Sequence, residues 1–510
     1  MTKIEEKNQK WWIFAAMTSV VSMIFIDVSV LPVALPTIQR SLGLSDLGLY
    51  WILNGYTLAL AVFILAGGRM GDRYGHRWVF LYGLFFFTLG SILCGLSQGE
   101  AWFISSRILQ GLGGALLIPT SAATLFNAFP APQRGKAMGL YISVGTVFLS
   151  VGPFIGGIFT QYFTWRLIFW INIPIAILGF ILTLLVVPKS KGNRSHPFDF
   201  IGFFAASLAI SALTVAIMQV KKWGWFSPWT IGLIILALFL FILLFAVDRT
   251  AEDPYIDFSL FKNRNFLGAI AAIFCTQFVL MVTIFWSIYF QTVFHFSPSQ
   301  AGTLSLISNA PLILAAPLGG HLLDRHGPRV PILIGFFLVT GSLFWFLLNL
   351  QERSVPILLS ALIPFGCGIP MILTPSFATA LGEIPPERRG LASGTSSMIR
   401  QIGSTLGLAL FGTLFLEVNL SQFGQILRTN VQTQTLDPTR FQGLLSQTPT
   451  AVQALQPFSS KTQAFISKSF LHSYINGFWA INMLAAVIAL VGGILAFILI
   501  KKRTKPEIEI

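Results

Sequence analysis

Long apolar stretches recur along almost the whole chain, and each is long enough to form a membrane-spanning helix. A helix of about 20 apolar residues crosses the ~30 Å hydrocarbon layer of a bilayer. Only 10% of the 510 residues are charged and 54% are hydrophobic, a balance that excludes an ordinary soluble enzyme. We therefore expect an all-α integral membrane protein with fourteen transmembrane helices, at roughly 12 to 35, 48 to 69, 79 to 97, 101 to 128, 137 to 161, 167 to 187, 200 to 220, 228 to 247, 266 to 291, 299 to 322, 330 to 350, 355 to 381, 391 to 416 and 474 to 500.

The basic residues of the loops indicate how these spans are oriented. An even number of spans puts both termini on one side of the membrane. With the N-terminus inside, 22 of the 33 Lys and Arg residues fall in inner segments and nine in outer ones, while Arg107 and Arg400 fall within spans. Because basic residues are enriched in cytoplasmic loops, we expect the cytoplasmic (inner) membrane with both termini inside. The net charge of +14 is then mainly an orientation signal and not the mark of a nucleic-acid partner.

Two loops of the chain repeat one pattern of glycines and charges. Positions 67–77 read GGRMGDRYGHR, and positions 319–329 read GGHLLDRHGPR. Glycine allows a tight turn between two helices, and an Asp near a helix N-terminus is favoured by the helix dipole. Two merely topogenic turns would explain the charge but not the repeated spacing. The shared positions are Gly68/Gly320, Asp72/Asp324, Arg73/Arg325, Gly75/Gly327 and Arg77/Arg329.

One carboxylate and one guanidinium of the predicted spans suggest a shared site. Asp27 is the only carboxylate well inside any span, and a charge there costs roughly 2.5 to 3.5 kcal/mol, which makes it a functional hypothesis by default. Counting along each helix puts Asp27 and Arg107 both ~9 Å from the outer face. A movement that separates or rejoins them would release or take up a proton. The alternative is a static buried ion pair.

The span at 137 to 161 contains a motif of glycine and proline, GTVFLSVGPFIGG at 145–157. Gly152 and Gly156 are four residues apart, so they share one helical face and let another backbone approach closely. Pro153 removes a backbone donor and bends the helix. Taken alone, the pattern is also compatible with ordinary tight packing.

Together these motifs resemble the major facilitator superfamily. The segment GRMGDRYGHR at 68–77 is similar to the signature of that family, with departures at Met70 and His76, and 145–157 resembles its antiporter motif. Four further segments resemble its fourteen-span drug:proton antiporter branch, with Leu31 and Pro32 as departures in the first. These segments are IDVSVLPVALPTI from Ile26, RILQGLGGA from Arg107, WRLIFWINIPI from Trp165 and SGTSSMIRQIGSTLG from Ser393.

The resemblance implies an architecture and a set of functional residues. It implies six-helix bundles at 1–190 and 251–510, two inserted helices at 191–250, an outer loop at about 417–473, and transport by alternating access. We expect short amphipathic helices at the outer interface in that loop. The resemblance further implies proton coupling by Asp27 and Arg107. It implies an antiporter motif of Gly145, Gly152, Pro153, Gly156 and Gly157, and a cytoplasmic gate of Gly68, Asp72, Arg73, Gly75, Arg77, Asp324 and Arg325.

A lipophilic face of the span at 266 to 291 is the candidate wall of a substrate cavity. Its residues are spaced about one helical turn apart, and flexible Met and aromatic side chains suit varied ligands. Packing or lipid contact is the alternative. Arg400, near the midplane of another span, either binds backbone carbonyls or water, or faces the cavity and attracts an anionic substrate. The candidate residues are Gln277, Met281, Phe285, Trp286, Tyr289 and Arg400.

These features predict a proton-coupled exporter of lipophilic drugs or toxic small molecules, and not an enzyme. No GxxxxGK[ST] loop for a nucleotide and no metal-ligand spacing occur in the sequence, so the expected energy source is the proton gradient, without a cofactor. The expected partners are a small-molecule substrate, protons and lipid, with a periplasmic adaptor protein left open. One alternative is a dedicated exporter of an anionic metabolite or siderophore, and another is a non-transporting membrane receptor or scaffold.

Overall fold

The computed structural model describes residues 6–189, 199–249, 255–256, 258–350, 354–382, 389–430 and 432–501. Every element of regular structure in those ranges is a helix. The N-terminal part contains α1 (Glu6–Leu42), α2 (Asp46–Tyr74), α3 (His76–Gly95), α4 (Glu100–Ala128), α5 (Ala131–Tyr162), α6 (Leu167–Trp170) and α7 (Asn172–Val186), followed by α8 (Phe200–Trp223) and α9 (Pro228–Asp248).

The C-terminal part begins with the 3-10 helix η1 (Phe258–Lys262). The helices that follow are α10 (Arg264–Leu280), α11 (Val282–Val293), α12 (Pro298–Asn309), α13 (Pro311–His326), α14 (Arg329–Asn349), α15 (Val355–Gly382) and α16 (Arg389–Arg428). The 3-10 helix η4 (Pro438–Phe441), α17 (Pro449–Leu455) and α18 (Ser460–Leu499) complete the chain.

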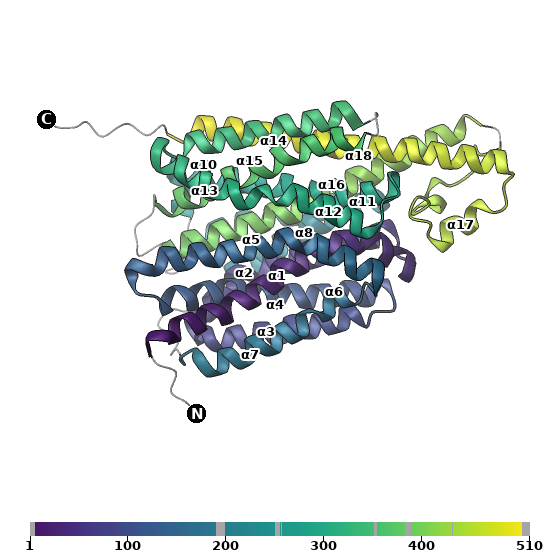
Figure 1. Cartoon of the computed structure of the whole chain (residues 1–510). Helices are drawn as coiled ribbons and strands as arrows, with labels where there is room; N and C mark the ends of the chain where they lie inside the picture. Colours follow the sequence, from purple (N-terminus) through teal and green to yellow (C-terminus); the bar gives the residue numbers. More distant parts are fainter. Residues whose placement is uncertain are drawn as a thin grey trace.

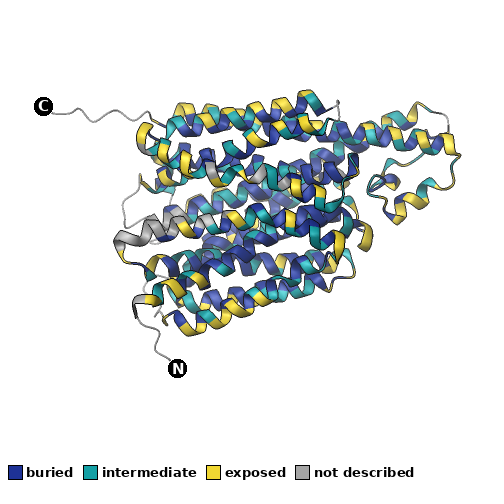
Figure 2. Ribbon diagram, in the orientation of Figure 1, coloured by how far each residue is buried: buried dark blue, intermediate teal, exposed yellow. Residues whose placement is uncertain are grey.

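The helices confirm a multi-pass membrane protein. In the ranges described above, twelve helical stretches are long and apolar enough to cross a bilayer. Apolar side chains as large as Phe337 and Leu348 of α14 are 77% exposed, which suits a surface that faces lipid. Figure 2 shows exposed residues along the outer edges of α7 and α14, with buried residues between the helices.

Three of the expected spans contain a break that the apolar pattern does not reveal. The pair α6 and α7 is interrupted at Ile171, α10 and α11 at Met281, and α12 and α13 at Ala310, directly before Pro311. Proline cannot donate to the preceding turn, so a new helix starts there. At Ile171 and Met281 the backbone angles stay close to helical values. Each break is therefore a local interruption, and the chain does not turn back on itself there.

The helices form two bundles, one before α8 and one after α9. In the first, α1 packs against α4, α5 and α7, and in the second α18 packs against α10, α14 and α16. Helix α8 contacts α2 of the first bundle and α16 of the second. The start of α1 and the end of α18 lie at the same end of the molecule, on the left in Figure 1, and α17 lies at the opposite end. We call these the terminal end and the distal end.

Two helices at the distal end are longer than the predicted spans. Helices α16 and α18 are each 40 residues long, or ~60 Å, about twice the thickness of the hydrocarbon layer. Both therefore continue past the predicted spans at 391 to 416 and 474 to 500. The chain between them folds onto these extensions through a separate apolar cluster, whose buried members are Phe423, Leu427, Phe441, Leu444, Ala451, Ile466 and Phe470.

The two repeated loops form the same tight turn. Gly75 ends α2 with φ +96°, and Gly327 ends α13 with φ +77°. Each glycine donates its N–H to a carbonyl four residues earlier, that of Gly71 or Leu323. Other residues rarely adopt a positive φ, so this geometry explains the repeated glycine.

Candidate functional site: a buried ion pair and its supporting helices

Asp27 and Arg107 are in direct contact inside the first bundle. The Arg107 Nη1 atom lies 2.7 Å from Asp27 Oδ2, and the side chains are 2% and 0% exposed. The depth estimated from the sequence therefore places the two groups correctly at one level. Asp27 comes from α1 and Arg107 from α4, so the ion pair connects two helices in the middle of the bundle.

Two amide side chains that the sequence analysis did not single out complete the surroundings of Asp27. Gln110 Nε2 donates to Asp27 Oδ1 at 2.6 Å, and Asn172 Nδ2 donates to the same oxygen at 3.2 Å. Both amides also donate to Ser91 Oγ, at 2.8 and 3.1 Å. Side chains of α4 and α7 thus meet at the carboxylate of α1, and Ser91 of α3 accepts hydrogen bonds from both amides. Gln110 lies within the segment RILQGLGGA, and Asn172 lies within WRLIFWINIPI. An amide side chain among apolar residues is the sequence feature that could have identified each of them.

The network suits a charged carboxylate. Arg107, Gln110 and Asn172 all act as donors toward Asp27, and hydrogen bonds that are donated to an ionised acceptor stabilise that form. The Arg107 guanidinium stays protonated in proteins and can only donate hydrogen bonds. It lies 4.2 Å from the centroid of the Tyr56 ring, a cation–π contact that further compensates its burial. Binding of a proton at Asp27 would remove the charge for which these donors are arranged.

The predicted antiporter motif is the face of α5 that packs on α1 and α12. A Cβ atom on Gly145 would lie 2.7 Å from the Phe25 ring, and one on Gly156 would lie 2.7 Å from the carbonyl oxygen of Val30. A Cβ atom on Gly152 would overlap Ser29. Gly157 faces the backbone of Pro298 and Ser299 in the second bundle, and the backbone at Pro153 faces Gly302 there. The motif thus joins Asp27's helix to the junction of the two bundles.

At the terminal end, the first loop motif has contacts within the first bundle, and its Arg69 also lies over the ring of Tyr255, 5.7 Å from the centroid. Arg77 donates to the carbonyl oxygens of Val187 and Leu184, at 2.6 and 2.9 Å, and so caps the last turn of α7. The Asp72 carboxylate lies 3.3 Å from His76 Nε2, and Arg73 lies over the ring of Tyr74. Gly68 faces Pro119 of α4. A role of these residues in a gate between the bundles stays a prediction.

The second loop motif contributes less to the described structure. Arg325 is exposed in the last turn of α13. The side chain of Asp324 lies outside the described residues. Most of the described contacts of the expected gate residues therefore involve the first loop motif.

The three aromatic residues of the predicted cavity wall lie in two different surroundings. Two pack inside the second bundle, and the third contacts the first bundle. Trp286 stacks on Phe346 and donates from Nε1 to Asn482 at 2.9 Å, and Tyr289 stacks on Phe478 with 4.1 Å between centroids. These two side chains are core residues of the second bundle. Phe285 instead lies 5.5 Å from the Tyr50 ring of the first bundle.

The remaining members of the predicted wall are buried or half-buried. Met281 accepts a hydrogen bond from Ser404, and Gln277 is 7% exposed. Arg400 is half-buried in α16, and its Nε has no hydrogen-bond partner in the described part of the chain. Contact of any of these residues with a substrate stays a prediction.

The fold and the buried pair define a multi-pass transporter built from two helical bundles. The Major Facilitator Superfamily matches residues 17–408 of the chain, and the protein belongs to this family. It is 36% identical to the multidrug resistance protein Stp of Mycobacterium tuberculosis over 77% of this chain and 73% of that protein. It is 32% identical to the riboflavin transporter RibZ of Clostridioides difficile over 80% of this chain and 89% of that protein.

A solved structure has the same fold. The bacterial homologue of the human lysosomal transporter Spinster, in an inward-facing and unoccupied conformation, superposes with a TM-score of 0.64 at 16% sequence identity, covering 98% of this chain and 99% of that one.

Proposed function

We propose that this protein is a proton-coupled exporter of lipophilic drugs or toxic small molecules in the cytoplasmic membrane. The proposal includes fourteen spans, with both termini inside and the distal end outside. The observation that carries it is the buried Asp27–Arg107 pair, 2.7 Å apart on helices that pack against the antiporter motif. The multidrug resistance relative supports the substrate class.

The proposed coupling step is protonation of Asp27. A neutral carboxyl no longer attracts Arg107, so the contact between α1 and α4 weakens. Helix α1 also packs against the glycine face of α5, and α5 meets the second bundle at α12. Gain or loss of the proton therefore changes the contact between α1 and α4, and a movement of α1 that follows also changes its packing against α5. One proton that moves down about 1 pH unit and ~100 mV releases about 3.7 kcal/mol, enough for a substrate gradient of a few hundred-fold.

Efflux from cells with and without the protein tests this function. Lipophilic cations and carboxylated metabolites are loaded in parallel, and each is followed before and after a protonophore collapses the proton gradient. We expect the lipophilic compounds to leave faster when the protein is present and to lose this advantage with the protonophore. Protein-dependent efflux that persists after the gradient has collapsed would contradict proton coupling.

Export of an anionic metabolite is the second candidate. Arg400 is half-buried within a span and has no ion-pair partner among the described residues, which supports an anionic cargo. A relative named a riboflavin transporter supports a dedicated metabolite in place of a range of drugs. Selective efflux of the carboxylated compounds, lost in Arg400→Gln, would favour this candidate.

A further inference from the structure

The segment that leads from α9 into the second bundle packs against both bundles at the terminal end. We call its residues 255–256 and 258–262 the connector. Tyr255 and Ile256 are buried in the apolar cluster that the first bundle forms with α8 and α9. Leu260 is buried in an apolar cluster of the second bundle, and Phe261 packs against both clusters. The connector is therefore attached to both halves of the molecule.

Two carboxylates hold the backbone of the connector. Asp199 caps the start of α8, and Asp248 is the last residue of α9. The backbone N–H of Tyr255 donates to Asp199 Oδ2 and to Asp248 Oδ1, each at 3.2 Å, and that of Ile256 donates to Asp248 Oδ2 at 3.2 Å. Hydrogen bonds to charged acceptors are stronger than neutral ones, so the ends of α8 and α9 fix this part of the chain.

The side chain of Tyr255 lies between α8 and the first loop motif. Tyr255 is 1% exposed, and its ring contacts Phe203 of α8 edge to face, with centroids 5.9 Å apart. The Arg69 guanidinium lies 5.7 Å from the centroid of the same ring, within the range of a cation–π contact. A Cβ atom on Gly202 would lie 2.8 Å from Tyr255 Cβ. Tyr255 thus joins α8 to the end of α2 that carries the expected gate.

This attachment opposes a separation of the bundles at the terminal end. Alternating access requires the bundles to separate at this end in one of its states. Tyr255 is held to the first bundle and Leu260 to the second, and only a few residues of chain lie between them. Separation therefore strains the contacts of the connector on one side or the other.

We propose that Tyr255 is a positioning residue of the terminal-end gate, fixed by Asp199 and Asp248 against Arg69. Through this residue, α8 and α9 restrain the opening of the terminal end. The proposal rests on the proposed function only in assuming alternating access.

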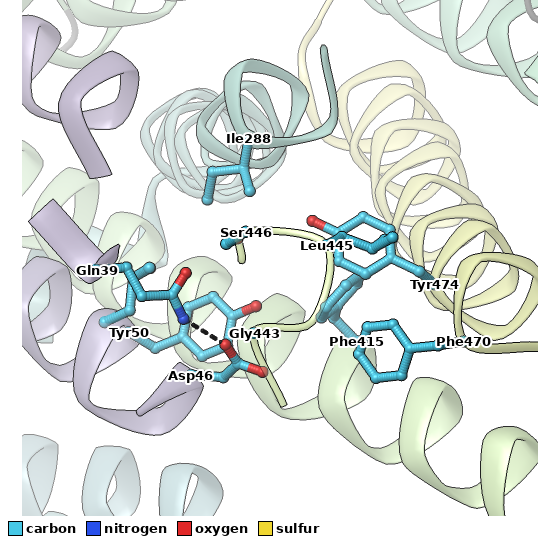
Figure 3. Close-up of a pocket in the computed structure, with 11 residues that line it drawn as sticks. Gln39, Asp46, Tyr50, Ile288, Phe415, Gly443, Leu445, Ser446, Phe470 and Tyr474 are labelled. Carbon is cyan, nitrogen blue, oxygen red and sulfur yellow. Dashed lines mark hydrogen bonds between the residues drawn. The ribbon is translucent and has the colours of Figure 1, made fainter. Parts of the chain in front are cut away.

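Two cysteine reporters, one for each end, test this role. Leu65→Cys reports on the terminal side of the junction, because Leu65 is 6% exposed and a Cβ atom on Gly394 of α16 would lie 2.9 Å from its Cδ1. Ile288→Cys reports on the distal side. Ile288 is 9% exposed and lies on the wall of a pocket that both bundles line (Figure 3).

The measurement is the rate at which each reporter reacts with a water-soluble maleimide in protein purified into lipid nanodiscs. The chain without a reporter gives the background from its own cysteines. Tyr255→Leu should speed labelling of Leu65→Cys about three-fold or more, because it removes the ring that Arg69 contacts. The same change should slow labelling of Ile288→Cys, because the two ends open in different states of one equilibrium.

Two variants serve as controls for the change at Tyr255. Tyr255→Phe keeps the ring and should change both rates less than Tyr255→Leu does. Tyr82→Leu makes the same replacement on α3, where Tyr82 is 61% exposed, and should leave both rates unchanged. If Tyr255→Leu is not recovered folded, Arg69→Gln removes the cation instead and should shift both rates in the directions expected for Tyr255→Leu.

Opposite shifts at the two ends support a gate, because a merely loosened structure would expose both reporters. Faster labelling at both reporters, or unchanged rates at both, would overturn the proposal. Labelling needs neither drug nor proton gradient, so this result is independent of the efflux assay.

Discussion

At the scale of single residues, the central feature is a carboxylate whose partners all donate hydrogen bonds. Asp27 and Arg107 are almost completely buried, and each compensates the cost of removing the other from water. Removal of one partner of such a pair leaves an unpaired charge and destabilises more than removal of both. The arrangement therefore predicts a strong energetic coupling between these two positions.

A double-mutant cycle measures this coupling. Arg107→Leu should lower the free energy of unfolding by about 3 to 5 kcal/mol, because Asp27 then keeps only amide donors. The double variant Asp27→Asn/Arg107→Leu should recover a substantial part of the loss. Thermal unfolding of the four purified proteins in one detergent gives the cycle. Additive losses would contradict a coupled pair.

The sequence reveals the charges of this site but not its amides. Asp27 and Arg107 are conspicuous because a charge in an apolar run is costly and rare. Gln110, Asn172 and Ser91 are uncharged, so the sequence does not distinguish them from other polar residues of the spans. The structure shows that the two amides donate to Asp27 and that Ser91 accepts from both amides. Trp286 shows a different limit of the sequence, which does not reveal that this aromatic residue stacks on Phe346 in the second bundle.

At the scale of elements, the glycine face of α5 sets how closely two helices approach. Gly145, Gly152 and Gly156 leave no room for a Cβ atom against α1. The carbonyl of Val30 is part of the α1 backbone and cannot rotate away. A side chain at Gly156 would therefore push α1 and α5 apart.

Gly156→Val tests this packing against a matched control. The variant should lose about 1 to 3 kcal/mol of stability through overpacking and should lose most of its transport. At Gly232 of α9, no heavy atom lies within 4 Å of the position that a Cβ atom would occupy, so Gly232→Val should change neither property appreciably. The comparison uses thermal unfolding and efflux of the same drug. Similar losses in both variants would argue against a specific α1–α5 contact.

Element positions follow from the sequence better than element ends. Apolar runs locate the helices because side chains that face lipid must be apolar. A helix can continue beyond its apolar run when other contacts stabilise the extension. This explains why α16 extends to Arg428 and α18 starts at Ser460, where the cluster around Phe423 covers their polar extensions.

At the scale of the whole molecule, α8 connects the two bundles through contacts with α2 and α16. Thr413 of α16 donates to the carbonyl oxygen of Ile217 in α8 at 2.9 Å, and Trp225, after α8, donates to Glu417 at 3.4 Å. The sequence places α8 and α9 between the bundles by order along the chain. It contains no signal that Gly443 lines one pocket with Gln39 and Asp46 of the first bundle, because that position depends on how the chain between α16 and α18 folds.

Labelling of single cysteines in intact cells tests the proposed orientation. Gln453 of α17 and Lys189 after α7 are both exposed, at the distal and the terminal end respectively. With basic residues retained inside, an impermeant maleimide should label Gln453→Cys in intact cells and Lys189→Cys only after permeabilisation. The reversed pattern would contradict termini on the cytoplasmic side.

The most direct measurement of the central claim is substrate-dependent proton movement by Asp27→Asn in proteoliposomes. Asparagine keeps the shape of the side chain but cannot carry the proton, so the account predicts that proton movement is abolished while the protein remains folded. Substrate-dependent proton movement that equals that of the unmodified protein would contradict the assignment of coupling to Asp27.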